Sequence, residues 1–580
     1  MTEMGQRLRM IAVVAILVLA WAGLGTRLCF LHLGDNDRLL SHIRDIREIE
    51  QDLVVSRGRV LDCSGNIMAL DLTMRKVAVD PKFLRENGHP RFTGLQLSRL
   101  LALDPAMVFA SISRPDRQYV ELMDQVPEET VRQIEAMKLP GVRCPEFSQR
   151  HYPRGNLMSH VIGFANAEAV GSAGVEQRME RYLRGVPGLR VTEVDGKRRE
   201  VYTRRVMEIE PQPGADVQLT LDQNLQYFTE KALDDGMATN GAKGGWAIVQ
   251  RVRTGEILAM ASRPDYNLNA YNEASPEARL NRAIGYVFEP GSVFKIIVYA
   301  AAFNEGILTP EEIFDCENGL WHYAGKPLKD YHPYGRLSAA DALKKSSNIA
   351  AAKIAIRLGE ERLYRYLKAF GIGTPTGIAL PGEEGGILYP RSRWTKLSVT
   401  RIPMGHEVAV TSMQMLQAVS AVANNGELMR PLVLKRVSNA KGERLQVPAE
   451  EAVSHPIRPE TARLMARLLT AVTEEGTGKK AKVEGHSVAG KTGTAEKPGP
   501  GGYDAKRNLA SFVGFLPAEN PEISIMVTFD EPHGDFRTGG AVAAPVFRAI
   551  AEQAARYLDI PPVPETQRFS YAGGAAGSAR

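Results

Sequence analysis

Cysteine is scarce in this sequence. The 580 residues include four cysteines, Cys29, Cys63, Cys144 and Cys316, and no two of them have the C-x-x-C spacing that zinc sites and thioredoxin-like redox sites use. The cysteines therefore predict neither a metal site nor a redox centre, and their pairing stays open. The first 213 residues also lack a glycine-rich phosphate loop. We expect no metal and no cofactor.

The chain also has little excess charge of either sign. Seventy-two Lys and Arg residues against 67 Asp and Glu residues give a net charge of +5. This charge is slight for the length, so it does not argue for nucleic acid as a partner, although it suits contact with an anionic surface. With 44% hydrophobic and 24% charged residues, the composition is that of a folded protein with several domains.

A long uncharged run lies near the start of the chain. Met10–Gly25 carries no charge and is somewhat shorter than the roughly 20 residues that cross a bilayer. A snorkelling Arg27 would lengthen the span, and Arg7 and Arg9 before the run predict a cytoplasmic N-terminus. Ala20–Ala22 also offers the small-x-small site of a cleaved signal peptide. A tryptophan within that site and the continuing apolar stretch favour an anchor, and both interpretations export the rest of the chain.

Patterns along the remaining sequence predict two folded parts. Arg38–Val55 has helical periodicity, and Ser64–Asn66 between two apolar runs predicts a hairpin. Pro and Gly content indicates a boundary near Gln212–Gly214. We therefore expect an α+β multidomain protein whose segments are a cytoplasmic tip with a transmembrane helix (1–36), a non-catalytic α+β module (37–213), a second domain (214–560) and a disordered tail (561–580).

The second part is predicted to contain a sheet with flanking helices. Val217–Leu221 alternates as a strand does, and Asp222 caps a helix that runs to about Thr239. The further predicted elements are strands at 247–251, 256–260, 510–515 and 523–529, and a closing helix at 546–558.

One strongly apolar helix in this part carries two polar residues. After a break at Pro290–Gly291, Ser292 and Lys295 precede Ile296–Phe303, which is apolar on nearly every face and predicts a buried helix. Spaced three apart, Ser292 and Lys295 are neighbours on one helix face. A serine needs an adjacent base to become a nucleophile, and a partly desolvated lysine with a lowered pKa is such a base. The alternative is an N-cap serine followed by a snorkelling lysine.

Two further polar motifs follow. Ser346–Asn348 ends a helix that starts at Ser338 with a capping-box pattern, and Lys491–Thr494 precedes a Pro/Gly loop. Alone, neither motif is informative, because a Ser-Ser-Asn triplet more often marks a helix terminus or a turn. Together with Ser292 and Lys295, however, they make an S-x-x-K, S-x-N and K-T-G set. This set, in this order, is typical of penicillin-binding proteins and β-lactamases.

Over nearly its whole length the chain resembles class B penicillin-binding proteins. Arg57–Gly65 resembles the family's N-terminal R-G-x-I-x-D-R-x-G motif, with Cys63 in place of the usual arginine. Tyr152–Gly155, His160–Phe164 and Gly174–Glu176 resemble later motifs of the non-catalytic module. The resemblance implies a pedestal or dimerisation-type module at 37–213. It also implies a penicillin-binding transpeptidase domain at 214–560, with a central antiparallel sheet, flanking helices and an all-helical subregion.

The resemblance also implies roles for the first two motifs. Ser292 attacks the carbonyl carbon of a D-alanyl-D-alanine stem peptide and becomes acylated, and Lys295 takes its proton. Ser346 relays that proton to the leaving amine. Asn348 positions the substrate amide.

The third motif is expected to bind the terminal carboxylate of the substrate. Its residues are Lys491, Thr492, Gly493 and Thr494. Repulsion from Lys491 would help to keep Lys295 neutral. The backbone N–H groups of Ser292 and Thr494 would form the oxyanion hole.

Two other motifs favour different functions. Gly485–Thr492 matches the P-loop pattern G-x-x-x-x-G-K-T, but charged residues precede it and Pro498 and Pro500 prevent a long helix after it. Glu277–Asn281 resembles the segment that carries the deacylating glutamate of class A β-lactamases. Because it precedes Ser292 instead of following the S-x-N motif, we expect hydrolysis of an acyl-enzyme to be slow.

Within class B, three stretches resemble the division-specific, FtsI-type transpeptidase: Ala78–Lys82, Gly405–Thr411 and Gly539–Phe547. The resemblance implies septal cross-linking of stem peptides at the bacterial inner membrane, inhibited by β-lactams. The catalytic domain would lie outside the membrane, beside a SEDS-type glycan polymerase and other divisome proteins. Four alternatives stay open: an elongation-specific class B transpeptidase, a β-lactam-responsive receptor, an inactive divisome scaffold, and a D,D-carboxypeptidase or β-lactamase.

Overall fold

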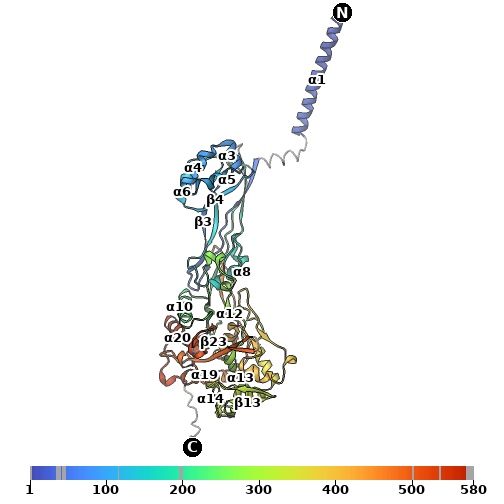
Figure 1. Cartoon of the computed structure of the whole chain (residues 1–580). Coiled ribbons are helices and arrows are strands. Elements are labelled where there is room, and N and C mark those ends of the chain that lie inside the picture. The colour runs from blue at the N-terminus through green and yellow to red at the C-terminus, as the bar shows by residue number, and fades with distance from the viewer. Residues whose placement is uncertain are drawn as a thin grey trace. The chain divides into compact units, whose positions relative to one another are not determined.

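A computed structural model describes residues 3–33, 41, 47–114, 116–194, 200–499, 502–534 and 537–569 (Figure 1). Contacts divide the chain into two compact units. The first contains Met1–Val55 and Val186–Gln212, and the second contains Ser56–Gly185 and Pro213–Arg580. Each unit is therefore built from segments that are distant in the sequence.

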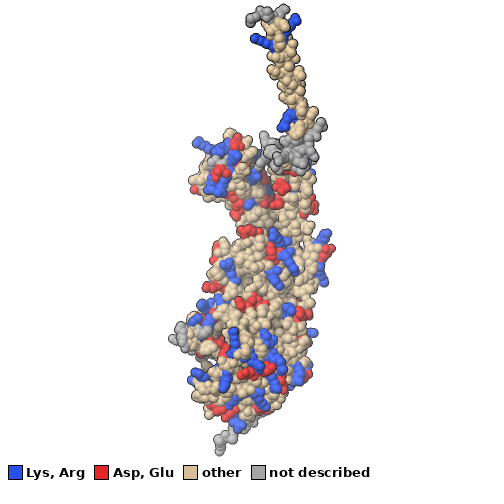
Figure 2. All heavy atoms as spheres, turned by 90° about the vertical axis from the view of Figure 1, so that its right-hand side faces the viewer, with Lys and Arg blue, Asp and Glu red and all other residues tan. Residues whose placement is uncertain are grey.

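The first unit begins with the long apolar helix α1, Glu3–Leu33. Its stretch Met4–His32 has 29 residues and contains an 18-residue window with a mean hydropathy of 2.2. At about 1.5 Å per residue this stretch is roughly 44 Å long, more than the roughly 30 Å of a bilayer's hydrocarbon core. Figure 2 shows the helix apolar or neutral along most of its length, with basic side chains near both ends. The helix is long and apolar enough to cross a membrane.

The same unit contains a three-stranded antiparallel sheet in the order β1-β7-β8. The strands are β1 Glu48–Leu53, β7 Gly188–Val194 and β8 Glu200–Ile209. The helix predicted for Arg38–Val55 is therefore wrong over β1, where pairing with β7 overrides a weak local helical preference. Residues 38–40 and 42–46 of that prediction lie outside the described residues.

In the second unit, an eight-stranded sheet links the segment after Ser56 to the residues after Pro213. Its order is β20-β19-β9-β2-β3-β4, and β5 and β6 also pair with β3. The predicted hairpin at Ser64–Asn66 is confirmed, since it joins β2 to β3 with Gly65 at a φ of 93°. The strands are β2 Val60–Leu61, β3 Ile67–Val79, β4 Val120–Val126, β5 Val142–Arg143, β6 Glu146–His151, β9 Asp216–Leu219, β19 Leu434–Ser438 and β20 Arg444–Gln446.

Four helices pack with the end of β3 around a separate hydrophobic core that includes Val77 and Val79. Three of these helices begin with a proline, whose fixed φ suits the first helical turn and whose missing N–H costs nothing there. The helices are α3 Pro81–Asn87, α4 Pro90–Leu100, α5 Pro105–Ile112 and α6 Glu128–Ala136.

After Pro213, the chain is organised around a five-stranded antiparallel sheet in the order β11-β10-β24-β23-β22. Alternate residues of β10 join two different cores, as the period of a strand requires. Ala247 and Val249 pack with α10 and α20, whereas Trp246 and Ile248 pack with α13 and α18 on the other face. The strands are β10 Gly244–Arg251, β11 Ile257–Arg263, β22 Ala489–Gly499, β23 Gly502–Leu516 and β24 Ile523–Asp530.

Helices cover both faces of this sheet, as predicted. Asp222 caps α10 through Asn224 N, as its position in the sequence indicates. The helical subregion also contains short antiparallel strand pairs, among them β13 Leu320–Tyr323 with β14 Lys326–Lys329. The larger helices are α10 Gln223–Asn240, α13 Lys295–Asn304, α14 Ala339–Lys344, α15 Asn348–Leu358, α16 Glu360–Ala369, α18 Ser412–Ala423, α19 Pro459–Glu474 and α20 Gly539–Tyr557.

The predicted disordered tail, 561–580, is ordered in its first part. Glu565–Gln567 form a short 3₁₀ turn, η7, and Phe569 N donates to Glu519 at 2.5 Å. This contact with the body of the domain explains the difference from a prediction based on composition alone. Residues 570–580 lie outside the described residues.

Candidate active site

Ser292 lies where two elements approach each other closely. Gly291–Phe294 form the 3₁₀ helix η2, which leads directly into the buried helix α13. A Cβ atom on Gly291, whose φ is 61°, would lie 2.6 Å from the Thr494 carbonyl oxygen. A Cβ atom on Gly493 would lie 3.0 Å from Val293 Cγ1. Because both positions lack a side chain, η2 packs directly against strand β22 and holds the partly buried Ser292 beside it.

Lys295 is fully buried and surrounded by oxygen atoms. Its Nζ lies 3.2 Å from Ser292 Oγ, 2.6 Å from Ser346 O, 3.1 Å from Ser346 Oγ and 2.7 Å from Asn348 Oδ1. Burial lowers the pKa of Lys295 to about 7, although the Asp330 carboxylate acts in the opposite direction. A substantial fraction of this amine is therefore neutral near pH 7, within hydrogen-bond distance of the Ser292 hydroxyl.

The S-x-N motif lies in a bend between two helices. The predicted cap of α14 at Ser338 is confirmed, because its hydroxyl accepts from the Asp341 N–H at 3.0 Å. The prediction that the motif ends this helix is also confirmed, because the Ser347 N–H donates to the carbonyl oxygen of Ala342, inside α14, at 2.8 Å. Ser346 adopts a left-handed φ of 61°, and Asn348 is the first residue of α15, which Ser347 caps. The motif therefore ends one helix and starts the next, with Ser347 as the cap of the second helix.

Lys491 reaches the same serine hydroxyl from the sheet. It is fully buried on the edge strand β22, and its Nζ lies 2.9 Å from Ser346 Oγ and 3.3 Å from Thr492 O. Burial, followed by repulsion from Lys295, lowers the pKa of Lys491 well below its usual value. Two ammonium groups at one hydroxyl oxygen repel each other in this buried site, so double protonation is disfavoured.

Alternation along β22 directs the neighbours of Lys491 to the other face. Thr492 Oγ1 lies 2.8 Å from Thr477 Oγ1. Thr494 Oγ1 accepts from the Gly539 N–H, at the start of α20, at 3.1 Å. The strand therefore presents a lysine to the helical part and two threonine hydroxyls to the side of α20.

Five predicted residues form one hydrogen-bonded group: Ser292, Lys295, Ser346, Asn348 and Lys491. The threonines of the third motif contact Thr477 and Gly539 instead. The Ser292 hydroxyl lies beside a buried amine that can take its proton during attack. The Ser346 hydroxyl lies between the two lysine amines and can pass a proton to a leaving group. The arrangement is therefore suited to acyl transfer through a covalent serine intermediate.

Two residues at the site were not predicted from the sequence, Asp330 and Thr477. Asp330 accepts from Asn348 N at 2.5 Å and from Ser347 Oγ at 2.7 Å, and Thr477 contacts Thr492. Neither belongs to a motif or to a regular element, and folding alone brings each to the site. A chemical signal existed only for Asp330, as an acidic residue shortly before the S-x-N motif.

Hydrogen bonds of Glu289, the residue before the Pro-Gly break, link it to two other segments of the chain. Glu289 Oε1 accepts from Tyr503 OH at 3.0 Å, and Glu289 Oε2 lies 3.1 Å from His406 Nδ1. The contacts join the approach to Ser292 with the Gly405–Thr411 stretch and with the β22–β23 hairpin. No sequence pattern indicated this link.

The P-loop interpretation of Gly485–Thr492 is excluded by the structure, because Lys491 lies within strand β22 and no helix follows it. The helix N-terminus on which a P-loop relies is therefore missing there.

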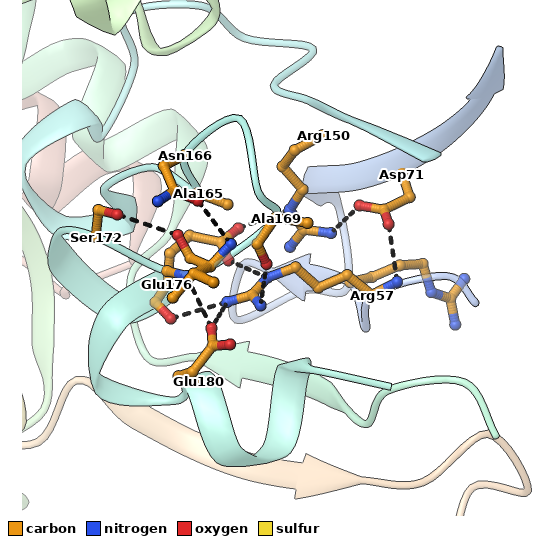
Figure 3. Close-up of polar contacts among 12 residues, drawn as sticks. Arg57, Asp71, Arg150, Ala165, Asn166, Ala169, Ser172, Glu176 and Glu180 are labelled. Atoms are coloured by element: carbon orange, nitrogen blue, oxygen red, sulfur yellow. Dashed lines mark hydrogen bonds and ion pairs between the residues drawn. The ribbon is translucent and has the colours of Figure 1, made fainter. Parts of the chain in front are cut away.

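A second polar cluster lies in the non-catalytic part (Figure 3). Arg57 bonds Glu176 and Glu180, each at 2.6 Å, and Arg150 bonds Glu176 at 2.7 Å and Asp71 at 3.0 Å. Figure 3 shows Arg57 beside the two glutamates and Arg150 reaching Asp71. Buried charges are tolerated when they are paired in this way. The cluster joins segments that are more than 100 residues apart, since 119 positions separate Arg57 from Glu176.

Comparisons with known proteins agree with this geometry. Residues 245–552 match the penicillin-binding protein transpeptidase domain, and residues 52–219 match the penicillin-binding protein dimerisation domain. Stage V sporulation protein D of Bacillus subtilis is 31% identical over 564 residues, which cover 96% of this chain and 86% of that protein. Peptidoglycan D,D-transpeptidase FtsI of Escherichia coli is 31% identical over 555 residues, covering 94% and 91%.

A solved structure gives the same result. Penicillin-binding protein 3 of Mycobacterium tuberculosis, complexed with aztreonam, superposes with a TM-score of 0.68 at 25% identity, covering 90% of this chain and 100% of that chain. The predicted family, fold class and enzyme class are thereby confirmed. With both domains matched and almost the full length of these relatives covered, the chain belongs to the class B penicillin-binding proteins, the serine-type peptidoglycan D,D-transpeptidases.

Proposed function

We propose that this protein cross-links peptidoglycan stem peptides through an acyl-enzyme on Ser292. The observation that carries the proposal is the 3.2 Å contact between Lys295 Nζ and Ser292 Oγ. Burial lowers the pKa of Lys295 to about 7, so the neutral amine accepts the serine proton while Oγ attacks the carbonyl carbon of the D-alanyl-D-alanine bond.

The remaining steps use the other residues of the group. Ser346 Oγ, which contacts both lysines, passes a proton to the leaving nitrogen. The C–N bond breaks, D-alanine leaves, and the acyl group stays on Ser292. An acceptor amine of a second stem peptide then attacks the ester carbonyl, and Ser292 Oγ leaves and regains a proton. Asn348 positions the substrate amide, and the backbone N–H groups of Ser292 and Thr494 stabilise the oxyanion.

The terminal carboxylate of the substrate binds at the third motif, with residues Lys491, Thr492, Gly493 and Thr494. Repulsion between the two buried lysines disfavours a second charge. A carboxylate beside Lys491 favours the proton on that lysine and so leaves Lys295 neutral. Substrate binding therefore increases the fraction of the base that is ready to react.

Covalent labelling with a fluorescent penicillin tests the reaction. The wild-type protein should become labelled at Ser292, and Ser292→Ala should not. Absence of labelling in the folded wild type, or undiminished labelling of Ser292→Ala, would rule the mechanism out. The lifetime of the acyl-enzyme separates the hydrolytic alternatives, because a D,D-carboxypeptidase or β-lactamase would release the label rapidly.

We further propose a role in septal wall synthesis, beside a SEDS-type glycan polymerase and other divisome proteins. The FtsI relative and the resemblance at Gly405–Thr411 and Gly539–Phe547 support this role, while an equally similar relative is named for sporulation. Depletion should give filamentous cells, whereas an elongation-specific enzyme would give rounded cells. Rescue by Ser292→Ala would identify the protein as a scaffold or receptor whose acylation is dispensable.

The membrane arrangement we propose has the N-terminus in the cytoplasm and the catalytic domain on the outer side of the inner membrane, with a single span in α1. The corresponding domains are the tip and anchor at 1–36, the pedestal at 37–213, the transpeptidase domain at 214–560 and the tail at 561–580. Arg7 and Arg9 before the apolar run support this orientation. Protease added to intact spheroplasts should digest the catalytic domain, and protection of that domain would reverse the orientation.

A further inference from the structure

Asp330 directly follows strand β14 and faces the start of helix α15. Its Oδ1 accepts from the backbone N–H groups of Asn348, at 2.5 Å, and Ile349, at 3.1 Å. Its Oδ2 accepts from Ser347 Oγ at 2.7 Å. The first N–H groups of a helix have no partner within the helix, and the positive end of the helix dipole favours an anion. The carboxylate therefore holds the first turn of α15 from outside the helix.

The neighbouring residues of Asp330 fix the side chain of Asn348. Lys329 O accepts from Asn348 Nδ2 at 2.8 Å, which turns Asn348 Oδ1 toward Lys295 Nζ, 2.7 Å away. Leu328 of the same strand packs with Ile349 in a small hydrophobic cluster. The β13–β14 hairpin thus sets both the position of α15 and the direction of the asparagine amide.

The charge of Asp330 acts on the same site. The carboxylate opposes the effect of burial at Lys295 and raises the pKa of that lysine. The titratable groups around the two residues are Lys491, which faces Lys295, and Cys316, Tyr299 and Tyr334, which face Asp330. Among these groups of the described structure, Asp330 is the one carboxylate whose charge acts on Lys295, so it is the counter-charge to that lysine.

We propose that Asp330 is a positioning residue for acyl transfer, which holds Ser346 and Asn348 around Lys295 through the start of α15 and supplies the negative charge opposite Lys295. The proposal rests on acylation of Ser292. Asp330 does not touch the reacting atoms and acts through α15 and Lys295. One residue that directly follows the β13–β14 hairpin therefore controls both the geometry and the charge of the base.

The test is the pH dependence of the acylation rate constant of the full-length protein with a fluorescent penicillin. Asp330→Asn keeps the shape but removes the charge. A unit charge roughly 10 Å away in a medium of effective dielectric constant about 20 moves a pKa by about one unit. We expect the acid limb of the profile to move to lower pH by about that amount, together with a lower plateau rate.

Two matched variants separate charge from structure. Ser347→Ala removes the cap of α15 and one partner of Asp330 but keeps the charge of Asp330. The plateau rate constant of this variant should therefore fall, while the acid limb of its pH profile should stay where it is in the wild type. Asp341→Asn removes a carboxylate that pairs with Lys344 on the neighbouring helix α14 and should leave rate and limb unchanged. Because a rate constant is measured on the molecules that react, partial misfolding of a variant lowers the amplitude and not the midpoint.

The outcomes are distinct. The proposal is overturned if the acid limb of the Asp330→Asn pH profile coincides with that of the wild type. It is also overturned if Asp341→Asn shifts the acid limb as far as Asp330→Asn does. A wild-type protein that is never acylated overturns the proposed function itself, which is a different result from an acylated wild type with an unmoved variant.

Discussion

Acylation of Ser292 should depend on pH through Lys295. Burial lowers the pKa of this lysine from 10.5 to about 7. At pH 7 about half of the molecules then carry a neutral Lys295, against roughly one in 3000 for an exposed lysine. The acylation rate constant should fall about tenfold for each pH unit below 7 and become constant above it, because only the neutral amine accepts the serine proton.

Lys295→Arg is the sharpest perturbation of this step. The guanidinium stays charged at every accessible pH and cannot accept a proton. We expect the rate constant to fall at least about a thousandfold at neutral pH, in line with loss of a general base and of the contact geometry, and the acid limb to disappear. Time courses of labelling with a fluorescent penicillin, from about pH 5 to pH 9, measure both quantities.

Lys344→Arg is the matched control. Lys344 lies on α14, near the S-x-N motif, and ion pairs with Asp341 and Glu475 raise its pKa, with burial opposing them. Its replacement should change neither the rate nor the profile. The reasoning fails if Lys295→Arg keeps a rate within tenfold of wild type, or if the wild-type rate is independent of pH across the range.

Three further predictions concern stability and geometry. The pKa of Lys295 is lower in the folded than in the unfolded chain, so burial of the charged lysine lowers the free energy of unfolding. This destabilisation is complete below pH 7 and vanishes as the pH rises toward 10.5. Lys295→Met should therefore raise the free energy of unfolding near neutral pH, by at most about 5 kcal/mol minus the contribution of the lost hydrogen bonds. Urea melts should show a smaller difference between variant and wild type at pH 10 than at pH 7. Gly291→Ala, with its Cβ 2.6 Å from Thr494 O, should slow labelling about 100-fold. Gly306→Ala, at a φ of 67° but with nothing within 4 Å of its Cβ, should leave labelling unchanged. Equal effects of the two substitutions would mean that backbone strain, and not the contact with Thr494, slows the reaction. Arg57→Met should destabilise the protein by about 3–5 kcal/mol by leaving Glu176 and Glu180 short of a partner, whereas Arg59→Met, at an exposed pair with Asp216, should cost at most about 1 kcal/mol in the same melts.

Local patterns predicted much of the fold. The cap at Asp222, the hairpin at Ser64–Asn66 and the strands of the catalytic sheet follow from side-chain types and periodicity over a few residues. The predictions failed where a distant partner overrode the local pattern. Glu48–Leu53 became a strand because β7 pairs with it, and the residues after Pro564 became ordered through Glu519.

The active site divides in the same way. Ser292, Lys295, Ser346 and Lys491 were identified from the spacing of three motifs, because the chemistry restricts the residue types at those positions. Asp330 and Thr477 could not be identified, since a carboxylate or a hydroxyl in an irregular segment carries no local signature of the helix or strand that it will face. The pKa of Lys295 likewise depends on burial, which is a property of the whole fold.

By itself, the sequence determined the apolar N-terminal run, the nucleophile with its neighbouring lysine, and the order of the motifs, because each depends on residue types within a few positions. Only the tertiary structure decided that Ser346 stands between two buried lysines, that η2 lies against β22, and that Asp330 holds the start of α15. These contacts join segments that are tens to hundreds of residues apart. Their geometry follows from packing around a shared sheet, which no local pattern contains.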